Sequence, residues 1–146
     1  IWSLAHITLI KELPDGTALL FYLLFVISFS DIFAYFGGKR FGQSMLAPTI
    51  SPKKTWEGSF FGVLGGGIVG AVFGEITMST FWLYGMLLAM VLAVVGQLGD
   101  LIESKIKRLC NVKDSGTLLP GHGGILDRID GHMLAAPVFY YLLKLG

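Results

Sequence analysis

Long apolar runs are the feature that most limits what this chain can fold into. Residues 17–36, 58–74 and 81–98 contain a single charged side chain between them. A helix needs roughly 20 such residues to cross a bilayer. A fourth run, 132–145, is shorter and contains Pro137, so it would span only with residues borrowed from upstream or in a thinned bilayer. The runs predict an all-α integral membrane protein, a polytopic bundle of about four transmembrane helices with two polar loops.

Composition supports this class and argues against others. Of the 146 residues 53% are hydrophobic and only 14% are charged, whereas an average soluble domain has about 25% charged residues. A net charge of +1 and a single cysteine are not typical of a nucleic-acid-binding arm or a disulfide-stapled secreted module. We therefore expect no nucleic-acid partner. The chain starts at Ile1 inside an apolar stretch, which suggests a fragment or a processed chain, and residues 1–146 are expected to form one membrane-embedded region.

Basic residues predict the topology. Nine of the eleven lysines and arginines fall within residues 37–57 and 99–131, the segments between the first and second and between the third and fourth runs. Positively charged loops are retained on the cytosolic side of a membrane. Both polar segments are therefore predicted to share one membrane face, and that face is predicted to be the cytosolic one.

The second run carries glycine at every fourth position, at residues 58, 62, 66, 70 and 74. Such a stripe lets another helix approach closely, as small residues do in membranes. A groove that admits a lipid chain is the alternative interpretation. Close helix packing is favoured because it is the usual use of this pattern.

The first polar segment and the run before it contain candidate substrate-binding residues. Asp31 is the only carboxylate inside a run, where an ionised side chain costs at least ~2.5 kcal/mol unless it is paired or hydrated. It is either a solvated interfacial residue or part of a cavity shared with the polar segments. Lys53 or Lys54, with the hydroxyls of Ser51 and Thr55, could contact a phosphate. The two lysines could equally be topology signals or contacts to anionic lipid.

The second polar segment concentrates carboxylates at helical spacing. Asp100, Glu103 and Lys107 would share one face of a helix that continues out of the third run. Asp127 and Asp130 repeat the three-residue spacing where the fourth run is expected to start. Two acidic helix ends at one interface would suit a hard cation such as Mg²⁺, which prefers carboxylate oxygens.

Basic and glycine residues lie beside these acids. Four of them would neutralise polyphosphate oxygens: Lys107, Arg108, Lys113 and Arg128. A turn at residues 120–124 could bring backbone N–H groups to a phosphate through Gly123 and Gly124. Within it His122 is either a general base or, as we favour, a hydrogen-bond donor of the loop. His6 and His132 have no convergent partners in the sequence, so no function is expected of them.

Taken together, the second polar segment resembles the signature of the phosphatidate cytidylyltransferases, or CDP-diacylglycerol synthases. The matching positions are Ser104, Lys107, Arg108, Lys113, Asp114, Gly116, Leu119, Pro120, His122, Gly123, Gly124, Asp127, Arg128 and Asp130. Residues 30–31, 37–39 and 51–58 also resemble segments of bacterial members. The similarity runs from about residue 28 to residue 132. Family members are usually nearly twice this length, so the chain resembles their C-terminal, catalytic half.

The resemblance implies transfer of a cytidylyl group from CTP to phosphatidate, giving CDP-diacylglycerol and pyrophosphate with Mg²⁺ as cofactor, in the bacterial inner membrane. A homodimer is a further expectation from the resemblance. Asp100 and Asp127 would hold one or two cations, with Glu103 and Asp130 as further ligands or supports. The basic side chains named above would clamp phosphates, and Ser104 and the 120–124 turn would bind substrate. Asp31, Ser51, Lys53, Lys54 and Thr55 would close the site.

Two other functions stay open at this stage. A CDP-alcohol phosphotransferase also uses membrane-embedded aspartates and divalent ions, but it would carry them in a different pattern. A transporter or channel subunit would line an ion path with Asp31, Gln97 and Asp100. It would be favoured by repeated discontinuous helices, and the sequence shows no internal repeat.

Overall fold

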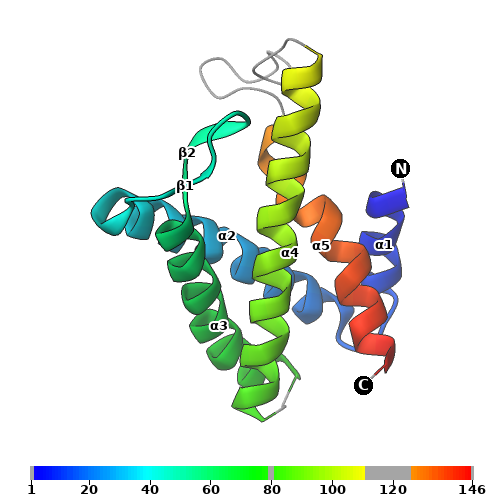
Figure 1. The fold of residues 1–146 in the computed structure, drawn as a ribbon. Coiled ribbons are helices and arrows are strands. Elements are labelled where there is room, and N and C mark those ends of the chain that lie inside the picture. The colour runs from blue at the N-terminus through cyan, green and yellow to red at the C-terminus, as the bar shows by residue number, and fades with distance from the viewer. Residues whose placement is uncertain (1, 79–80, 111–125, 146) are drawn as a thin grey trace.

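A computed structural model describes residues 2–78, 81–110 and 126–145 (Figure 1). Its elements, in chain order, are α1 (Trp2–Lys11), α2 (Gly16–Phe41), β1 (Met45–Ala47), β2 (Ser51–Thr55), α3 (Trp56–Met78), α4 (Trp82–Leu109) and α5 (Leu126–Leu145). The two strands form one antiparallel hairpin. The predicted helical membrane fold is confirmed, with a small hairpin added to it.

Among the described residues, three helices are long and apolar enough to cross a membrane: Gly16–Phe41, Trp56–Thr77 and Trp82–Leu109. They correspond to the first three predicted runs. The fourth run lies in α5, which has 20 residues and begins upstream of the run at Leu126. α5 is not one of the three spans, because its first turns contain two aspartates and an arginine.

α3 packs along both α2 and α4, and its glycines form these contacts (Figure 1). A Cβ atom added at Gly62 would lie 2.9 Å from the Ala34 Cβ atom and 2.9 Å from the Ser30 carbonyl oxygen of α2. One added at Gly70 would overlap the Ala89 Cβ atom of α4. The stripe therefore brings helix backbones together, as the packing interpretation predicts.

A buried core joins α2, α4 and α5. The Tyr22 hydroxyl of α2 donates to the Gly85 carbonyl of α4 at 2.6 Å, and its ring stacks on Phe139 of α5 with centroids 5.6 Å apart. Because a buried hydroxyl must find an acceptor, this bond fixes how α2 and α4 face each other.

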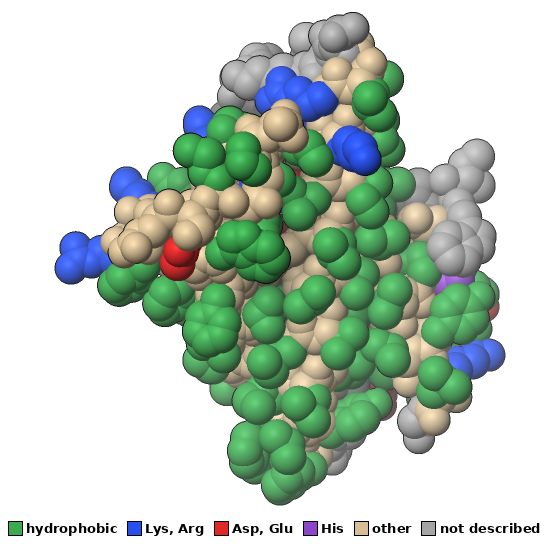
Figure 2. Space-filling view, in the orientation of Figure 1, with side chains coloured by type: hydrophobic (Ala, Val, Ile, Leu, Met, Phe, Trp, Pro, Cys, Tyr) green, Lys and Arg blue, Asp and Glu red, His purple; other side chains and the backbone are tan. Residues whose placement is uncertain are grey.

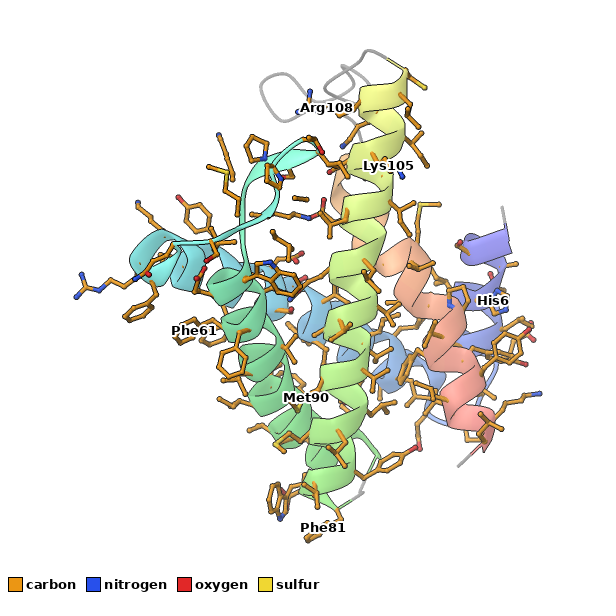
Figure 3. All side chains as sticks on the ribbon, viewed as in Figure 1. His6, Phe61, Phe81, Met90, Lys105 and Arg108 are labelled. Atoms are coloured by element: carbon orange, nitrogen blue, oxygen red, sulfur yellow. The ribbon has the colours of Figure 1, made fainter. Side chains whose placement is uncertain are left out.

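α1 docks on the outer side of α5 through a histidine (Figure 3). His6 is buried, and its ring centroid lies 5.5 Å from those of Tyr140 and of Tyr141. The sequence assigned no function to His6, and the structure gives its ring these packing contacts. Its partners come from the other end of the chain, which local spacing does not reveal.

The described parts of the two polar segments lie at one end of the bundle. The hairpin connects the end of α2 to the start of α3 and lies beside the C-terminal turns of α4 (Figure 1). Figure 2 shows most visible lysines and arginines around this end and hydrophobic side chains over the helix shafts. The hairpin and the C-terminal turns of α4 thus lie on the same side of the bundle, as the basic residues predict. These two elements form the polar end of the bundle.

Candidate active site

The first predicted polar loop is a hairpin built from local signals. Pro48 occupies the second position of a turn in which the Ile50 N–H donates to the Ala47 carbonyl at 3.2 Å, a position that suits its fixed φ. Thr55 ends β2 and caps α3, because its Oγ1 atom accepts the Gly58 N–H at 3.1 Å. Threonine is a favoured residue at this capping position. The strand therefore passes into α3 without a linker.

Contacts at both ends hold the hairpin in place. The Glu57 carboxylate accepts the N–H groups of Gln43, at 3.1 Å, and Ser44, at 3.3 Å. At the other end the Arg108 Nε atom of α4 donates to the Ile50 carbonyl at 3.4 Å (Figure 3). An isolated two-stranded hairpin is marginally stable in water, so these contacts position β2.

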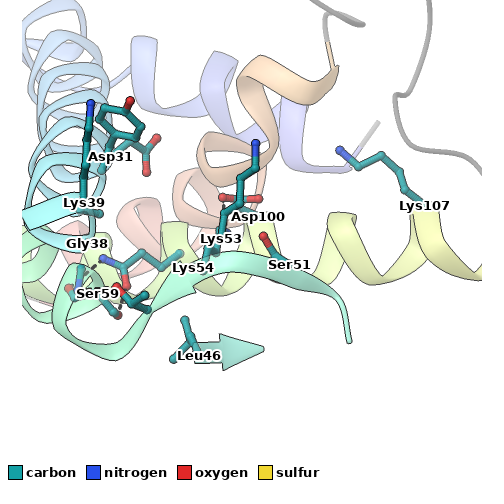
Figure 4. A pocket seen from close by; sticks show the side chains of 15 residues that line it. Asp31, Gly38, Lys39, Leu46, Ser51, Lys53, Lys54, Ser59, Asp100 and Lys107 are labelled. Atoms are coloured by element: carbon teal, nitrogen blue, oxygen red, sulfur yellow. Dashed lines mark hydrogen bonds and ion pairs between the residues drawn. The ribbon is translucent and has the colours of Figure 1, made fainter. Parts of the chain in front are cut away.

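Under the hairpin lies a pocket of about 600 Å³ (Figure 4), within the range of small-molecule sites. Its walls come from α2, both strands, α3 and α4. Seven of the predicted site residues line it: Asp31, Ser51, Lys53, Lys54, Thr55, Asp100 and Lys107. The structure therefore brings together residues from both polar segments and from the first span, and it places Asp31 in their common cavity.

Three other predicted residues lie on α4 beside the pocket. Ser104 donates from its Oγ atom to the Asp100 Oδ1 atom at 3.3 Å. Glu103 forms an ion pair with Lys107, with 3.6 Å between Nζ and Oε1, and Arg108 reaches the hairpin. Ser104 and Glu103 thus orient pocket residues.

The remaining predicted residues cannot be placed in the pocket. Lys113, His122, Gly123 and Gly124 lie outside the described residues. Asp127, Arg128 and Asp130 fall in the first turns of α5, as expected for the start of the fourth run, but their side chains lie outside the described part of the structure.

The charges of the pocket are mixed and partly paired. Its lining includes four lysines, Lys39, Lys53, Lys54 and Lys107, and two aspartates, Asp31 and Asp100. The Lys54 Nζ atom forms an ion pair with the Asp100 Oδ2 atom, and these side chains are 27% and 34% exposed. A lining of this kind can bind an anion through its lysines and a cation through its carboxylates.

Sequence reasoning gave no role in substrate binding to several lining residues. Ser59 of α3 donates from its hydroxyl to the Gln97 Oε1 atom of α4, and Gln97 Nε2 donates to the Ser59 carbonyl at 3.2 Å. Lys39 lies 5.9 Å from the centroid of the Tyr35 ring. Helical spacing was the available signal, because Tyr35 and Lys39 follow Asp31 at four-residue steps on one face of α2.

Asp100 can accept a cation, since an ammonium group already lies on its carboxylate. Within the described residues no group of three or more His, Cys, Asp or Glu side chains is arranged to hold a metal ion. The second predicted ligand, Asp127, has no described side chain. Among the described residues Asp100 is therefore the one predicted ligand whose side chain can be placed, and the magnesium site stays a prediction.

The fold and this pocket define a class: a multi-pass helical membrane protein with a charged pocket at one end of the bundle. The sequence comparison narrows this class. The model of the Cytidylyltransferase family matches residues 1–146, and the chain belongs to this family.

Three relatives are bacterial proteins named phosphatidate cytidylyltransferase. The chain is 44% identical to a phosphatidate cytidylyltransferase of Bacillus subtilis (strain 168) over 131 residues, covering 89% of this chain and 49% of that protein. It is 43% identical to that of Rickettsia bellii (strain RML369-C), covering 84% and 57% of the two chains. It is also 43% identical to that of Synechocystis sp., covering 92% and 46%. The chain spans about half the length of these curated relatives.

Proposed function

We propose that the protein transfers a cytidylyl group from CTP to phosphatidate, forming CDP-diacylglycerol and pyrophosphate at the cytosolic face of a bacterial inner membrane. The observation that carries this proposal is the pocket itself, which combines Asp31 and Asp100 with lysines from α2, β2 and α4 at the polar end of the bundle. Membership of the family and relatives named phosphatidate cytidylyltransferase support it.

The location of the pocket suits two substrates of different solubility. CTP arrives from water, whereas phosphatidate is held in the bilayer by its acyl chains. A pocket beside the ends of spanning helices lets a lipid headgroup enter from the membrane and a nucleotide enter from solvent. The positive-inside rule supports the cytosolic orientation.

In the proposed reaction a phosphate oxygen of phosphatidate attacks the α-phosphorus of CTP, and the bond from that phosphorus to the β-phosphate bridging oxygen breaks. Pyrophosphate leaves with the electron pair. The attacking oxygen is anionic at neutral pH, so no strong base is required. The main task of the protein is then to align the two phosphates and to offset their charge.

The described basic residues would contact different phosphates, according to the element on which they lie. Lys53 and Lys54 on the hairpin would meet the lipid phosphate, while Lys107 on α4 would meet the phosphates of CTP. Outside the described pocket walls, Arg108, Lys113 and Arg128 would be further phosphate ligands, and Ser104, His122, Gly123 and Gly124 would bind substrate through hydrogen bonds. Thr55 and Ser51 would add hydroxyl donors.

A divalent cation, when bound, offsets negative charge on the transferred phosphoryl group and on the leaving pyrophosphate. Asp100 and Asp127 would hold it, with Glu103 and Asp130 as supports, and Asp31 would add negative charge across the pocket. Dimerisation stays a prediction that rests on the resemblance to the family.

The test is an assay of purified protein in detergent with CTP, phosphatidate and Mg²⁺, following both products. We expect CDP-diacylglycerol and pyrophosphate in equal amounts, and neither product after chelation with EDTA. Folded protein that makes neither product would contradict the proposal. A parallel assay with CDP-diacylglycerol and an alcohol acceptor should release no CMP, since release would indicate a CDP-alcohol phosphotransferase.

A further inference from the structure

Lys53 and Lys54 are neighbours on β2, and both line the pocket, but their surroundings differ. Lys54 is half-buried and pairs with Asp100 across the gap between the hairpin and α4. Lys53 is exposed, and it forms no ion pair with the described carboxylates. The two lysines therefore differ in burial and in ion pairing before any substrate binds.

Both oxygens of the Asp100 carboxylate already have donors. The Oδ1 atom accepts from Ser104, and the Oδ2 atom is occupied by the Lys54 ammonium. A divalent cation that coordinates the Oδ2 atom would compete with that ammonium, because two cations on one carboxylate oxygen repel each other. Coordination of this oxygen by the ion thus requires Lys54 to move.

We propose that Lys54 is an exchangeable counter-ion of Asp100: it holds the carboxylate while no metal is bound, and metal binding releases its ammonium into the pocket to meet a substrate phosphate. This inference rests on the proposed function for the identity of that phosphate. Lys53 needs no release, because it faces the pocket without an acidic partner among the described residues. The exchange makes a phosphate-binding charge available only after the cation is in place.

Competition between Lys54 and the metal ion for Asp100 sets how much Lys54 weakens metal binding. When a ligand must displace an internal partner, its apparent dissociation constant equals the intrinsic constant divided by the fraction of molecules whose site is free. A partly exposed ion pair is populated only several-fold over its open form. Removal of Lys54 should therefore tighten metal binding about fivefold, whereas removal of Lys53 should alter only the general charge of the pocket.

The first experiment measures the dissociation constant of Mn²⁺ by electron paramagnetic resonance on detergent-purified protein without nucleotide. We expect Lys54→Met to bind Mn²⁺ about fivefold more tightly than wild type. Lys53→Met, which removes the same charge one residue away, should change the constant less than twofold. Lys54→Arg keeps the ion pair and should stay near wild type. Equal tightening in Lys54→Met and Lys53→Met would overturn the exchange.

The second experiment needs no variant. Amine-reactive labelling of wild type, read by mass spectrometry, compares Lys54 and Lys53 within one peptide before and after addition of Mn²⁺ alone. Metal should raise the labelling rate of Lys54 several-fold and leave that of Lys53 unchanged. In Asp100→Asn, Lys54 should label rapidly at the start and no longer respond to metal. A Lys54 rate in wild type that does not rise with metal would contradict the proposal.

An assay of CDP-diacylglycerol formation on the same wild-type sample separates the two proposals. Active protein in which Lys54 does not respond to metal would remove the exchange and leave the proposed function intact. Inactive protein in which Lys54 does respond would remove the proposed reaction while the exchange stands as a metal response. Wild type that binds no Mn²⁺ would overturn the exchange, and it would also remove Asp100 as a metal ligand.

Discussion

Contacts from the hairpin and from α4 itself converge on the carboxylate of Asp100. Lys54 approaches it from β2, Ser104 from the next turn of α4, and Asp31 lines the same pocket from α2. The contacts of this carboxylate therefore depend both on what occupies the pocket and on where the hairpin lies. It is the residue at which substitution should separate activity from stability most clearly.

We predict that Asp100→Asn lowers kcat for CDP-diacylglycerol formation by about 100-fold or more, because several kcal/mol of charge stabilisation by a bound cation would be lost. The melting temperature in detergent should shift by only a few degrees, since a partly exposed ion pair contributes about 0–1 kcal/mol. Product formation and thermal unfolding on the same preparation test this prediction.

Asp15→Asn is the matched control for that variant. Asp15 is exposed before α2, distant from the pocket, and has a φ of 56°, a conformation that asparagine also adopts readily. Its activity and its melting temperature should match wild type. Near-wild-type activity of Asp100→Asn would exclude Asp100 as a metal ligand.

Among the individual residues of the pocket, the sequence predicted the charged ones better than the neutral ones. Asp31, Asp100 and Lys107 were recognisable because charge is scarce in this chain and costly near the membrane. Ser59 was not assigned to the pocket, and Gln97 was grouped with Asp31 and Asp100 only as the lining of an ion path. Neutral polar side chains in helices have many uses, and the contact between these two joins α3 to α4. Such a contact leaves no mark in local spacing.

Among the elements, the hairpin is held at one of its ends by the Glu57 carboxylate. Glu57→Ala removes the acceptor of the Gln43 and Ser44 N–H groups. A hydrogen bond to an ionised acceptor is stronger than one between neutral groups, and at an exposed site solvent screens it. We therefore expect hydrogen exchange at these two amides to rise several-fold, with weaker use of phosphatidate as Lys53 and Lys54 lose their fixed position.

Glu75→Ala is the control for this variant, because Glu75 is an exposed residue near the opposite end of the same helix. It should leave exchange at residues 43–55 unchanged. If Glu57→Ala left amide exchange in the hairpin at the wild-type rate, Glu57 would not be its anchor.

The packing of α3 against α4 should be sensitive to one methyl group. A Cβ atom at Gly70 would overlap that of Ala89 and approach the Gly85 carbonyl oxygen to 2.9 Å. Overpacking of this kind costs about 1–3 kcal/mol, so Gly70→Ala should lower the melting temperature in detergent. Gly66→Ala, whose closest contact would be 3.2 Å to the Ala93 Cβ atom, should have a smaller effect. Equal melting temperatures for the two variants would contradict this close packing.

The helices were predictable from apolar runs, and the spacing of Asp100, Glu103 and Lys107 predicted that α4 continues past its run, to Leu109. The end of α2 at Phe41 and the hairpin were not predicted, because hydropathy marks where a helix meets hydrocarbon and not where its backbone hydrogen bonds stop. The hairpin has no alternating strand pattern. Its position depends on contacts with Glu57 and Arg108, and the partners of these contacts lie up to 58 residues apart in the chain.

At the scale of the whole molecule, the orientation of the polar end can be measured through the single cysteine. Cys110 is free and exposed just after α4. A membrane-impermeant maleimide should label it in inverted membrane vesicles and not in intact spheroplasts, since the basic segments favour the cytosolic side.

The paired control is Cys110→Ser combined with Glu75→Cys, which moves the thiol to the opposite end of the bundle. The labelling pattern should then invert. Labelling of Cys110 from outside the cell would reverse the proposed topology and, with it, the access of CTP to the pocket.

α4 also sets the depth of the pocket. Trp82 begins this helix and Asp100 follows 18 residues later, about 27 Å along the axis at 1.5 Å per residue. That length is close to the ~30 Å thickness of bilayer hydrocarbon. With Trp82 anchored at one boundary, as interfacial tryptophans are, Asp100 lies just inside the other. A thicker bilayer would draw the carboxylate toward hydrocarbon and a thinner one would lift it into water, so hydrophobic mismatch couples the surrounding lipid to the solvation of the pocket.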